Sequence, residues 1–208
     1  MVPRVDHLLT SGTFSLDGGC WEVENNVWVI GDDAECVLID APHDAAAIAT
    51  VIGERRLIAV LCTHAHDDHI SAAQQLASQF RAPVRLHPAD EVLWRRSYPE
   101  FGFTPLTDGD RITVADIELE VRHTPGHAPG AVCFYAPALT AVFSGDTLFQ
   151  GGPGATGRSY SDFPTIIDSI SRSLLTLPGG TVVHPGHGDD TTIADEASHV
   201  AEWVARGH

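Results

Sequence analysis

The sequence predicts an α/β fold in which two β-sheets pack face to face and helices cover their outer sides. Short apolar runs and alternating patterns typical of strands recur along the chain, separated by segments whose apolar residues fall at helical spacing. An early block of strands and helices is followed by a similar later block, and we see no linker between them. The 208 residues suffice to bury the core of such a sandwich, so we expect a single domain spanning residues 1–208.

The first block begins with strands. Residues 20–30 are rich in β-forming side chains and residues 35–39 form a second apolar run after a turn, which predicts an antiparallel meander. Asp44 can cap an alanine-rich helix that runs to about Glu54. The continuous apolar run over residues 57–62 is typical of a buried strand.

The rest of the chain continues this alternation. Apolar side chains at helical spacing after residue 69 predict a helix to residue 80. Further strands are expected at residues 84–86, 112–114, 117–121, 131–135, 141–144 and 181–183, and further helices at residues 89–94, 165–175 and 193–206. The glycine-rich residues 151–157 predict a flexible loop.

The composition excludes several classes of protein. Hydrophobic residues make up 43% and charged residues 19%, the balance of a globular protein, and nothing in the sequence approaches a membrane-spanning helix. The formal net charge of -16 argues against nucleic acid or an anionic membrane as a partner, because both require a basic face. All 12 basic residues are Arg, and the absence of Lys excludes a Schiff-base mechanism.

The N-terminal segment and the cysteines bear on the compartment. Residues 1–20 lack the uninterrupted apolar stretch of a signal peptide, so we expect a cytoplasmic location. Cys20, Cys36, Cys62 and Cys133 show no paired metal-ligand spacing and are expected to be buried free thiols. Cys20 and Cys36 could meet across neighbouring strands, but a disulfide would be unusual in a cytosolic domain.

The strongest chemical signal is the segment His64-Ala65-His66-Asp67-Asp68-His69, which follows the buried strand directly and leads into a helix. Alternate positions of an extended segment point the same way, so His64 and His66 converge, while the helix entry turns Asp68 and His69 to a neighbouring position. Converging neutral imidazoles and carboxylates are the ligands of a catalytic zinc or iron site. This loop is therefore predicted to serve two neighbouring metal ions.

Three later residues complete the candidate site. His127 lies in a Thr-Pro-Gly-His turn, Asp146 follows an apolar strand in Ser-Gly-Asp-Thr, and His187 lies in Pro-Gly-His-Gly. The neighbouring glycine or proline fixes the backbone so that each ligating side chain projects from a strand end. The isolated histidines are expected to be surface or hydrogen-bonded core residues: His7, His43, His87, His199 and His208.

This ordered set of motifs resembles that of the metallo-β-lactamase superfamily. The segments Thr-Pro-Gly-His and Gly-Asp-Thr-Leu-Phe resemble in particular its glyoxalase II-like hydrolase branch. The resemblance covers essentially the whole chain. It implies an αββα four-layer sandwich of two mixed β-sheets, with a two-metal centre at one edge of the paired sheets.

The resemblance also implies a role for each candidate residue. The first metal ion would be bound by His64, His66 and His127, the second by Asp68, His69 and His187, and Asp146 would bridge the two. Asp40 and Asp67 would hold the ligands in place by hydrogen bonds, with solvated or capping roles as equal alternatives. Zinc is the expected metal, and the same ligands also accept iron or manganese.

The reaction implied by the resemblance is hydrolysis of a thioester of a small thiol. Two metal ions held close together lower the pKa of a shared water and polarise the carbonyl, and Asp68 could orient that water while also serving as a ligand. The leaving thiolate has a conjugate-acid pKa of about 8.5, so no separate general acid is needed.

The sequence departs from the pattern of enzymes that hydrolyse glutathione thioesters. Those enzymes resemble one another in a basic C-terminal helical extension and in a lysine and a tyrosine on the loop after the bridging aspartate. This chain ends soon after His187, lacks Lys, and has Ala155 and Gly157 at those loop positions. Arg158 and Tyr160 are the candidate substrate-binding replacements, with a loop-fixing salt bridge and a packed ring as structural alternatives. We therefore expect another thiol carrier, such as mycothiol.

Other functions stay open. A mononuclear-iron persulfide dioxygenase resembles the same branch, binds iron through two histidines and an aspartate, and has a Gly-Arg-x-x-Phe-like segment that Gly157-Arg158 partly matches. A β-lactamase is less favoured, because Asp68 and Asp146 suit the hydrolase branch better than the cysteine-bearing lactamase sites. The complete ligand set speaks against a non-catalytic metal-binding protein.

Overall fold

Two mixed β-sheets form the centre of the structure, a computed structural model that describes residues 3–207. The first sheet contains, in spatial order, β1 (Arg4–Leu16), β2 (Gly19–Gly31), β3 (Glu35–Ile39), β4 (Arg56–Leu61), β5 (Val84–Leu86) and β6 (Thr104–Pro105). The strands from β1 to β3 are antiparallel, whereas those from β3 to β6 are parallel. The spatial order of this sheet therefore follows the chain.

The second sheet is built from the later part of the chain. Its spatial order is β14 (Thr191–Thr192), β13 (Val182–Pro185), β10 (Ala141–Gly145), β9 (Val132–Ala136), β8 (Ile117–His123) and β7 (Arg111–Val114). Only the β10 and β13 pair is parallel, so β8, β10 and β13 all end at the same edge. A separate two-stranded ribbon consists of β11 (Leu148–Phe149) and β12 (Gly152–Pro153).

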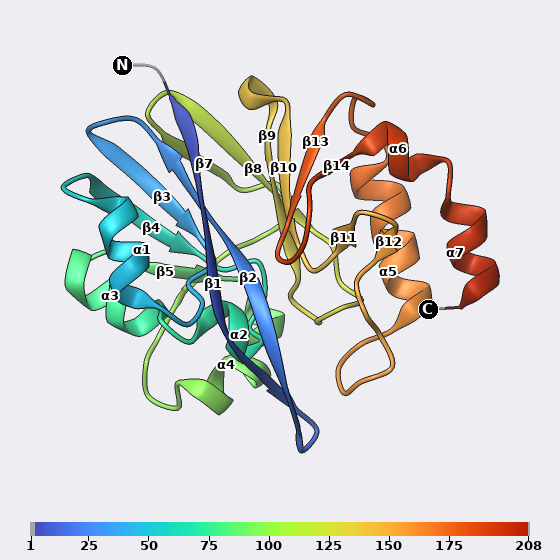
Figure 1. Cartoon of the computed structure of the whole chain (residues 1–208), viewed down its shortest axis with the longest axis horizontal. Coiled ribbons are helices and arrows are strands. Elements are labelled where there is room, and N and C mark those ends of the chain that lie inside the picture. The colour runs from blue at the N-terminus through green and yellow to red at the C-terminus, as the bar shows by residue number, and fades with distance from the viewer. Residues whose placement is uncertain (1–2, 208) are drawn as a thin grey trace.

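The helices lie on the outer sides of the two sheets (Figure 1). The helical segments that connect the strands of the first sheet are α1 (Ala45–Ile52), α2 (Asp67–Ile70), α3 (Ala73–Phe80), the 3-10 turn η1 (Pro88–Asp90) and α4 (Glu91–Ser97). The second sheet is associated with the 3-10 turn η2 (Pro137–Leu139), α5 (Phe163–Ser169), its π-helical continuation η3 (Ile170–Leu174), α6 (Ile193–Ala197) and α7 (Val200–Arg206). None of the helices within residues 3–207 is long and apolar enough to cross a membrane.

Three apolar cores separate these layers, because strand side chains alternate between the two faces of a sheet. In β2, Val27 and Val29 face the core under α1, α3 and α4, while Trp28 and Ile30 face the core between the sheets. A third core lies between the second sheet and the later helices, and Trp203 of α7 is buried in it. The two-sheet, four-layer α/β arrangement predicted from the sequence is confirmed.

The structure contains one long strand that the sequence pattern did not indicate. Strand β1 pairs with β2 along its full length, from Arg4 opposite Gly31 to Leu16 opposite Gly19. Asp17 and Gly18 form the two-residue turn and both have positive φ angles, 52° and 80°. An Asp-Gly pair is a strong hairpin signal, because such turns need two residues in the left-handed region. The hairpin extends past the body of the first sheet (Figure 1).

Two further sequence expectations need correction. Cys20 is exposed, because it lies next to the hairpin turn beyond the packed body of the sheet, whereas the other three cysteines are buried as expected. All four thiols are free. The predicted helix over residues 193–206 is divided into α6 and α7, and at the break the hydroxyl of Ser198 donates to the carbonyl of Asp195 at 3.2 Å. A serine that bonds to nearby backbone in this way competes with helix continuation.

Candidate metal centre

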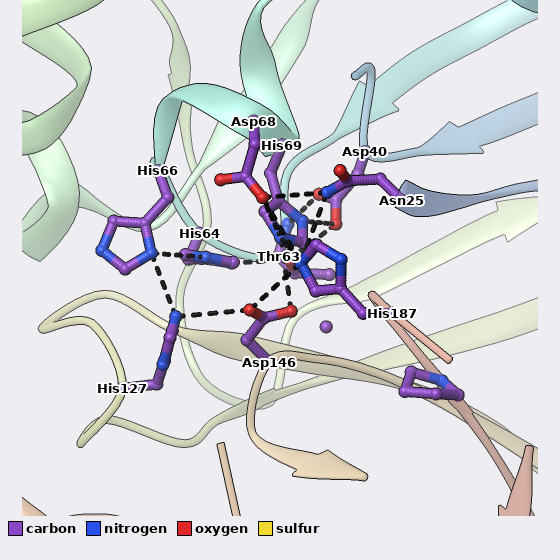
Figure 2. Close-up of polar contacts among 12 residues, drawn as sticks. Asn25, Asp40, Thr63, His64, His66, Asp68, His69, His127, Asp146 and His187 are labelled. Carbon is purple, nitrogen blue, oxygen red and sulfur yellow. Dashed lines mark hydrogen bonds and ion pairs between the residues drawn. The ribbon is translucent and has the colours of Figure 1, made fainter. Parts of the chain in front are cut away.

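Seven histidine and aspartate side chains meet where strands of both sheets end (Figure 2). The loop after β4 and helix α2 supply His64, His66, Asp68 and His69; the turns after β8, β10 and β13 supply His127, Asp146 and His187. The last three strands end at the same edge of the second sheet, which explains why residues far apart in sequence converge. The structure thus brings together all seven residues that the sequence predicted as ligands.

Three imidazoles form the first group. The Nδ1 atom of His66 lies 3.0 Å from Nε2 of His64 and 3.0 Å from Nε2 of His127. All three rings are buried. Their donor atoms are close enough for one ion to contact all of them, since they lie within 4.8 Å of one another.

A second group lies beside the first. Nε2 of His69 is 3.6 Å from Oδ2 of Asp68 and 3.3 Å from Nε2 of His187. The same Oδ2 atom lies 3.3 Å from Nε2 of His187. Two imidazoles and one carboxylate therefore converge on a second position.

Asp146 lies between the two groups. Its Oδ1 atom is 3.3 Å from Nε2 of His69, and its Oδ2 atom is 3.5 Å from Nε2 of both His127 and His187. Oδ1 is buried and has no hydrogen-bond partner among the described residues. A buried carboxylate oxygen without a partner is costly unless a cation meets it. This observation favours metal ions on both sides of Asp146.

Two histidines are oriented by backbone carbonyls. The Nδ1 atom of His127 lies 2.8 Å from the carbonyl oxygen of Ala155, and that of His187 lies 2.6 Å from the carbonyl oxygen of Glu24. A carbonyl can only accept, so each Nδ1 carries the proton. Nε2 of each ring thereby faces the centre, the orientation that metal ligation requires.

Asp40 orients two more histidines. Its Oδ2 atom accepts from Nδ1 of His69 at 2.8 Å and from the hydroxyl of Thr63 at 2.8 Å. Because that hydroxyl donates to Asp40, its oxygen is left to accept from Nδ1 of His64, 3.0 Å away. Both rings therefore direct Nε2 toward the centre. Asp40 has a φ of 57°, a backbone conformation that residues other than glycine rarely adopt.

His66 uses its other nitrogen. Its Nδ1 atom faces the first group, while Nε2 is buried without a hydrogen-bond partner in residues 3–207. The ring packs against Phe14 of the β1–β2 hairpin, with centroids 5.1 Å apart. His66 is thus held by packing, whereas the other four imidazoles are held by hydrogen bonds.

The protonation states fit a cation site. Burial lowers the pKa of His64 well below its usual value and that of His66 to about 3, and it also lowers the pKa of His127. Burial opposes ionisation of Asp68, but the charge of His69 and hydrogen bonds from His187 and Asn25 outweigh it, and the pKa is about 2. Three neutral imidazoles and the ionised carboxylates match the donor set that divalent ions require. Burial would also lower the pKa of His69 and His187, but Asp146 and Asp68 raise both, so these two rings lose a proton when a metal ion binds.

Two glycines allow the close approach of these turns. Gly145, before Asp146, has a φ of 50°, and a Cβ atom there would lie 2.5 Å from Oγ1 of Thr63. At Gly186, a Cβ atom would lie 2.4 Å from Oδ1 of Asp146. Both contacts are far shorter than real Cβ contacts, so a side chain at either position would push the two sheets' loops apart.

One polar residue that the sequence reasoning missed, Asn25, also supports the site. The amide of Asn25 donates to Oδ2 of Asp68 at 3.0 Å, and its carbonyl oxygen accepts from Nε2 of His43 at 2.8 Å. Asn25 and Asn26 lie in the middle of a strand, and asparagine is uncommon in strands, so a signal was present. His43 is a hydrogen-bonded, half-buried residue, as expected.

Asp90 was also missed. It is fully buried at the end of η1; its Oδ2 atom accepts from the backbone of Ala65 at 2.8 Å and its Oδ1 atom from the backbone of Gly130 at 2.5 Å. It therefore ties the loop of His64 and His66 to the turn that follows His127. Burial raises the pKa of Asp90 to about 6. An acidic residue in a short helical segment gives no sequence signal of such a role.

The remaining predicted residues lie at different distances from the centre. Asp67 accepts a hydrogen bond from the backbone of Ser15 at 3.0 Å, which anchors the β1–β2 hairpin rather than a ligand. Arg158 lines a pocket beside the seven residues, whereas Tyr160 is 45% exposed and is not among the lining residues. No salt bridge of Arg158 is found within residues 3–207, and its guanidinium instead stacks on Trp21. His208 lies outside the described residues.

Comparison with known proteins identifies the family. The model of the metallo-beta-lactamase superfamily matches residues 21–187, and the chain belongs to this superfamily. Among its relatives, the probable metallo-hydrolase YqgX of Bacillus subtilis is 34% identical, covering 84% of this chain and 90% of the relative. The hydroxyacylglutathione hydrolase GloC of Haemophilus influenzae is 32% identical, covering 83% and 90%.

Solved structures extend the comparison. TTHA1623 in a di-iron-bound form has a TM-score of 0.77 and 34% identity, covering 84% of this chain and 93% of that one. The B3 metallo-beta-lactamase BLEG-1 has a TM-score of 0.75 and 31% identity, covering 91% and 97%. ETHE1 from Myxococcus xanthus has a TM-score of 0.71 and 28% identity, covering 92% and 83%. This chain is therefore similar both to a hydroxyacylglutathione hydrolase and to a metallo-beta-lactamase, as well as to a protein solved in a di-iron-bound form.

Proposed function

We propose that this protein is a binuclear metal-dependent hydrolase that cleaves a thioester of a small thiol. The observation that carries the proposal is the position of Asp146, whose carboxylate contacts donor atoms of both groups of ligands. The assigned ligands are His64, His66 and His127 for one ion, Asp68, His69 and His187 for the other, and Asp146 as the bridge. The similarity to GloC supports a thioester substrate.

Bound divalent ions would supply a lowered pKa for a coordinated water and polarisation of the substrate carbonyl. Asp68 contributes through its second oxygen. Its Oδ2 atom is engaged with His69, His187 and Asn25, while Oδ1 makes no hydrogen bond to other described residues. With a pKa of about 2, Asp68 is ionised at neutral pH, and its carboxylate can accept a hydrogen bond from the attacking water.

The pocket beside the ligands suits a small, partly apolar acyl thiol. Phe14, Leu16 and Val23 contribute apolar side chains to the pocket lining beside the candidate ligands. A thiolate with a conjugate-acid pKa of about 8.5 leaves without a proton donor. Within residues 3–207, Asp68 and Asp146 are the carboxylic acids that line the pocket and no third one is found, which is compatible with this leaving group.

The proposal is tested with a panel of S-acyl thiols and metal-replete protein. The panel contains acyl derivatives of glutathione, mycothiol, coenzyme A and N-acetylcysteine, and free thiol is detected as it forms. We expect hydrolysis of at least one member and loss of more than about 100-fold in kcat for Asp146→Asn, because bound dications carry most of the carbonyl activation. No hydrolysis of any member would refute the thioesterase assignment.

Two alternatives have specific support. TTHA1623, solved in a di-iron-bound form, shows that a related chain holds iron, whereas the alternative of a persulfide dioxygenase requires a single iron. One iron per chain together with oxygen uptake on a persulfide would favour it. The similarity to BLEG-1 gives a β-lactam substrate more weight than the sequence alone did. Turnover of nitrocefin at rates exceeding those of all thioesters would favour the lactamase.

We further propose that residues 1–208 act as one domain in the cytoplasm. Four unpaired thiols support a reducing compartment. The net charge of -16 supports a small-molecule substrate rather than nucleic acid.

A further inference from the structure

The mouth of the pocket is formed by two segments far apart in the sequence. Residues 14–21, the hairpin tip, supply Phe14 and Leu16 to its lining; residues 155–161, the facing loop, supply Ala155, Arg158, Ser159 and Ser161. The backbone N–H of Ser159 donates to Oδ2 of Asp17 at 2.9 Å and joins the two segments. Figure 1 shows the hairpin tip and the loop after β12 on the same side of the molecule.

Arg158 crosses between these segments. Its guanidinium carbon lies 3.8 Å from the ring centroid of Trp21 and 5.3 Å from that of Phe14. No carboxylate within residues 3–207 forms an ion pair with it. The rings contact the guanidinium carbon, and no hydrogen bond from its N–H donors to a residue within 3–207 is found, so these donors are free for a ligand. The aromatic pair thus fixes the orientation of a cation with unused donors.

The negative charge around the pocket explains why a cation at its mouth would help to bind an anionic substrate group. Asp68 and Asp146 contribute carboxylates to the lining, and Arg158 is the sole arginine among the lining residues. An anionic substrate group would be repelled by the protein's overall charge unless a cation met it at the mouth. A planar guanidinium binds a carboxylate with two parallel hydrogen bonds.

We propose that Arg158, stacked on Trp21 and Phe14, is a specificity residue that binds a carboxylate of the substrate at the pocket mouth. This inference rests on the proposed thioesterase function and adds the substrate class, a thioester whose acyl or thiol part carries a carboxylate. The ester carbonyl lies over the metal centre while the carboxylate meets Arg158.

The test uses two matched thioesters of the same acyl group, one of N-acetylcysteine and one of N-acetylcysteamine, which differ only in a carboxylate. A second pair, succinyl and butyryl thioesters of N-acetylcysteamine, places the carboxylate on the acyl side. We expect Arg158→Met to lower the ratio of kcat/KM for the charged over the neutral substrate by about tenfold, mainly through KM, for at least one pair. Arg158→Lys restores part of the ratio. An unchanged ratio for both pairs overturns the proposal.

A control and a binding measurement separate this inference from the proposed function. Arg172→Met removes an exposed arginine paired with Asp168 on α5 and leaves both ratios unchanged. Non-hydrolysable S-alkyl thioethers of the same two thiols are titrated by calorimetry, and thermal unfolding verifies that each variant is folded. Carboxylate-dependent binding that Arg158→Met abolishes supports the subsite even where no thioester is hydrolysed. Equal binding of both thioethers, together with an unchanged ratio for the succinyl and butyryl pair, overturns it even where hydrolysis occurs.

Discussion

Asp40 accepts a hydrogen bond from Nδ1 of His69 at 2.8 Å, and both side chains are buried. The carboxylate fixes the ring orientation and leaves Nε2 facing the candidate metal centre. Through Thr63 it also determines the tautomer of His64. One residue that ligates nothing thereby controls a donor atom in each of the two groups of ligands.

Replacing Asp40 should weaken metal binding. We expect Asp40→Asn to raise the dissociation constant for zinc by about 10 to 100-fold, the usual effect of removing a partner that orients a ligating histidine. Competition with a chelator of known affinity measures it. Asp116→Asn is the matched control, because Asp116 is exposed in a turn with positive φ, where asparagine is tolerated. Equal zinc affinity of the two variants would show that Asp40 does not act on the ligands.

Asp90 should matter for stability as well as for metal affinity. Asp90→Ala leaves the backbone donors of Ala65 and Gly130 buried without acceptors, at a cost of about 1–3 kcal/mol each. Urea unfolding of metal-free protein measures the loss. Asp90→Asn should recover part of it, since its amide oxygen can still accept one of the two bonds. If the free energy of unfolding of Asp90→Ala lies within about 0.5 kcal/mol of the wild-type value, roughly the range for neutral surface changes, then Asp90 does not link the two loops.

Metal binding should release protons. Burial alone would lower the pKa of His187, but Asp146 and Asp68 raise it to about 10, so the metal-free protein holds this proton at pH 8. A metal ion needs the lone pair and displaces it, so zinc affinity falls as pH falls below 10. Since the unfolded pKa is about 6.5, His187 also stabilises the metal-free fold below that pH, and this contribution is lost as pH rises through 10. Calorimetry at pH 8 in buffers of different ionisation enthalpy should give different heats; identical heats would rule out proton release.

The cysteines should differ sharply in reactivity. Burial raises the pKa of the Cys36 and Cys133 thiols to about 11 and that of Cys62 well above its usual value. Cys20 is exposed. Because the thiolate is the nucleophile, iodoacetamide should modify the native protein once, at Cys20, and four times after unfolding. Mass spectrometry of intact protein and its peptides measures this, with Cys20→Ser as the unreactive control.

The layers of the fold and the seven converging residues could be predicted because their signals are local. Each candidate ligand follows an apolar strand and has glycine or proline nearby, or lies in one six-residue segment. The supporting residues could not be predicted in this way. Asp90 bonds to Ala65, 25 positions away, and Asn25 bonds to Asp68, 43 positions away, and only the fold brings these pairs together. Strand β1 was missed although its Asp17-Gly18 turn was visible. Tyr160 was expected at the pocket as a replacement for the loop tyrosine of glutathione thioester hydrolases, but it is exposed and does not line the pocket.

The number of metal ions per chain tests the central claim most directly. Metal-free protein is titrated with zinc, freed of excess ions, and analysed for metal and protein content. The geometry around Asp146 predicts two equivalents for the wild type and a loss of the second equivalent in His187→Ala, which removes a donor from one group alone. One equivalent or none bound by the folded wild-type protein would contradict a binuclear hydrolase.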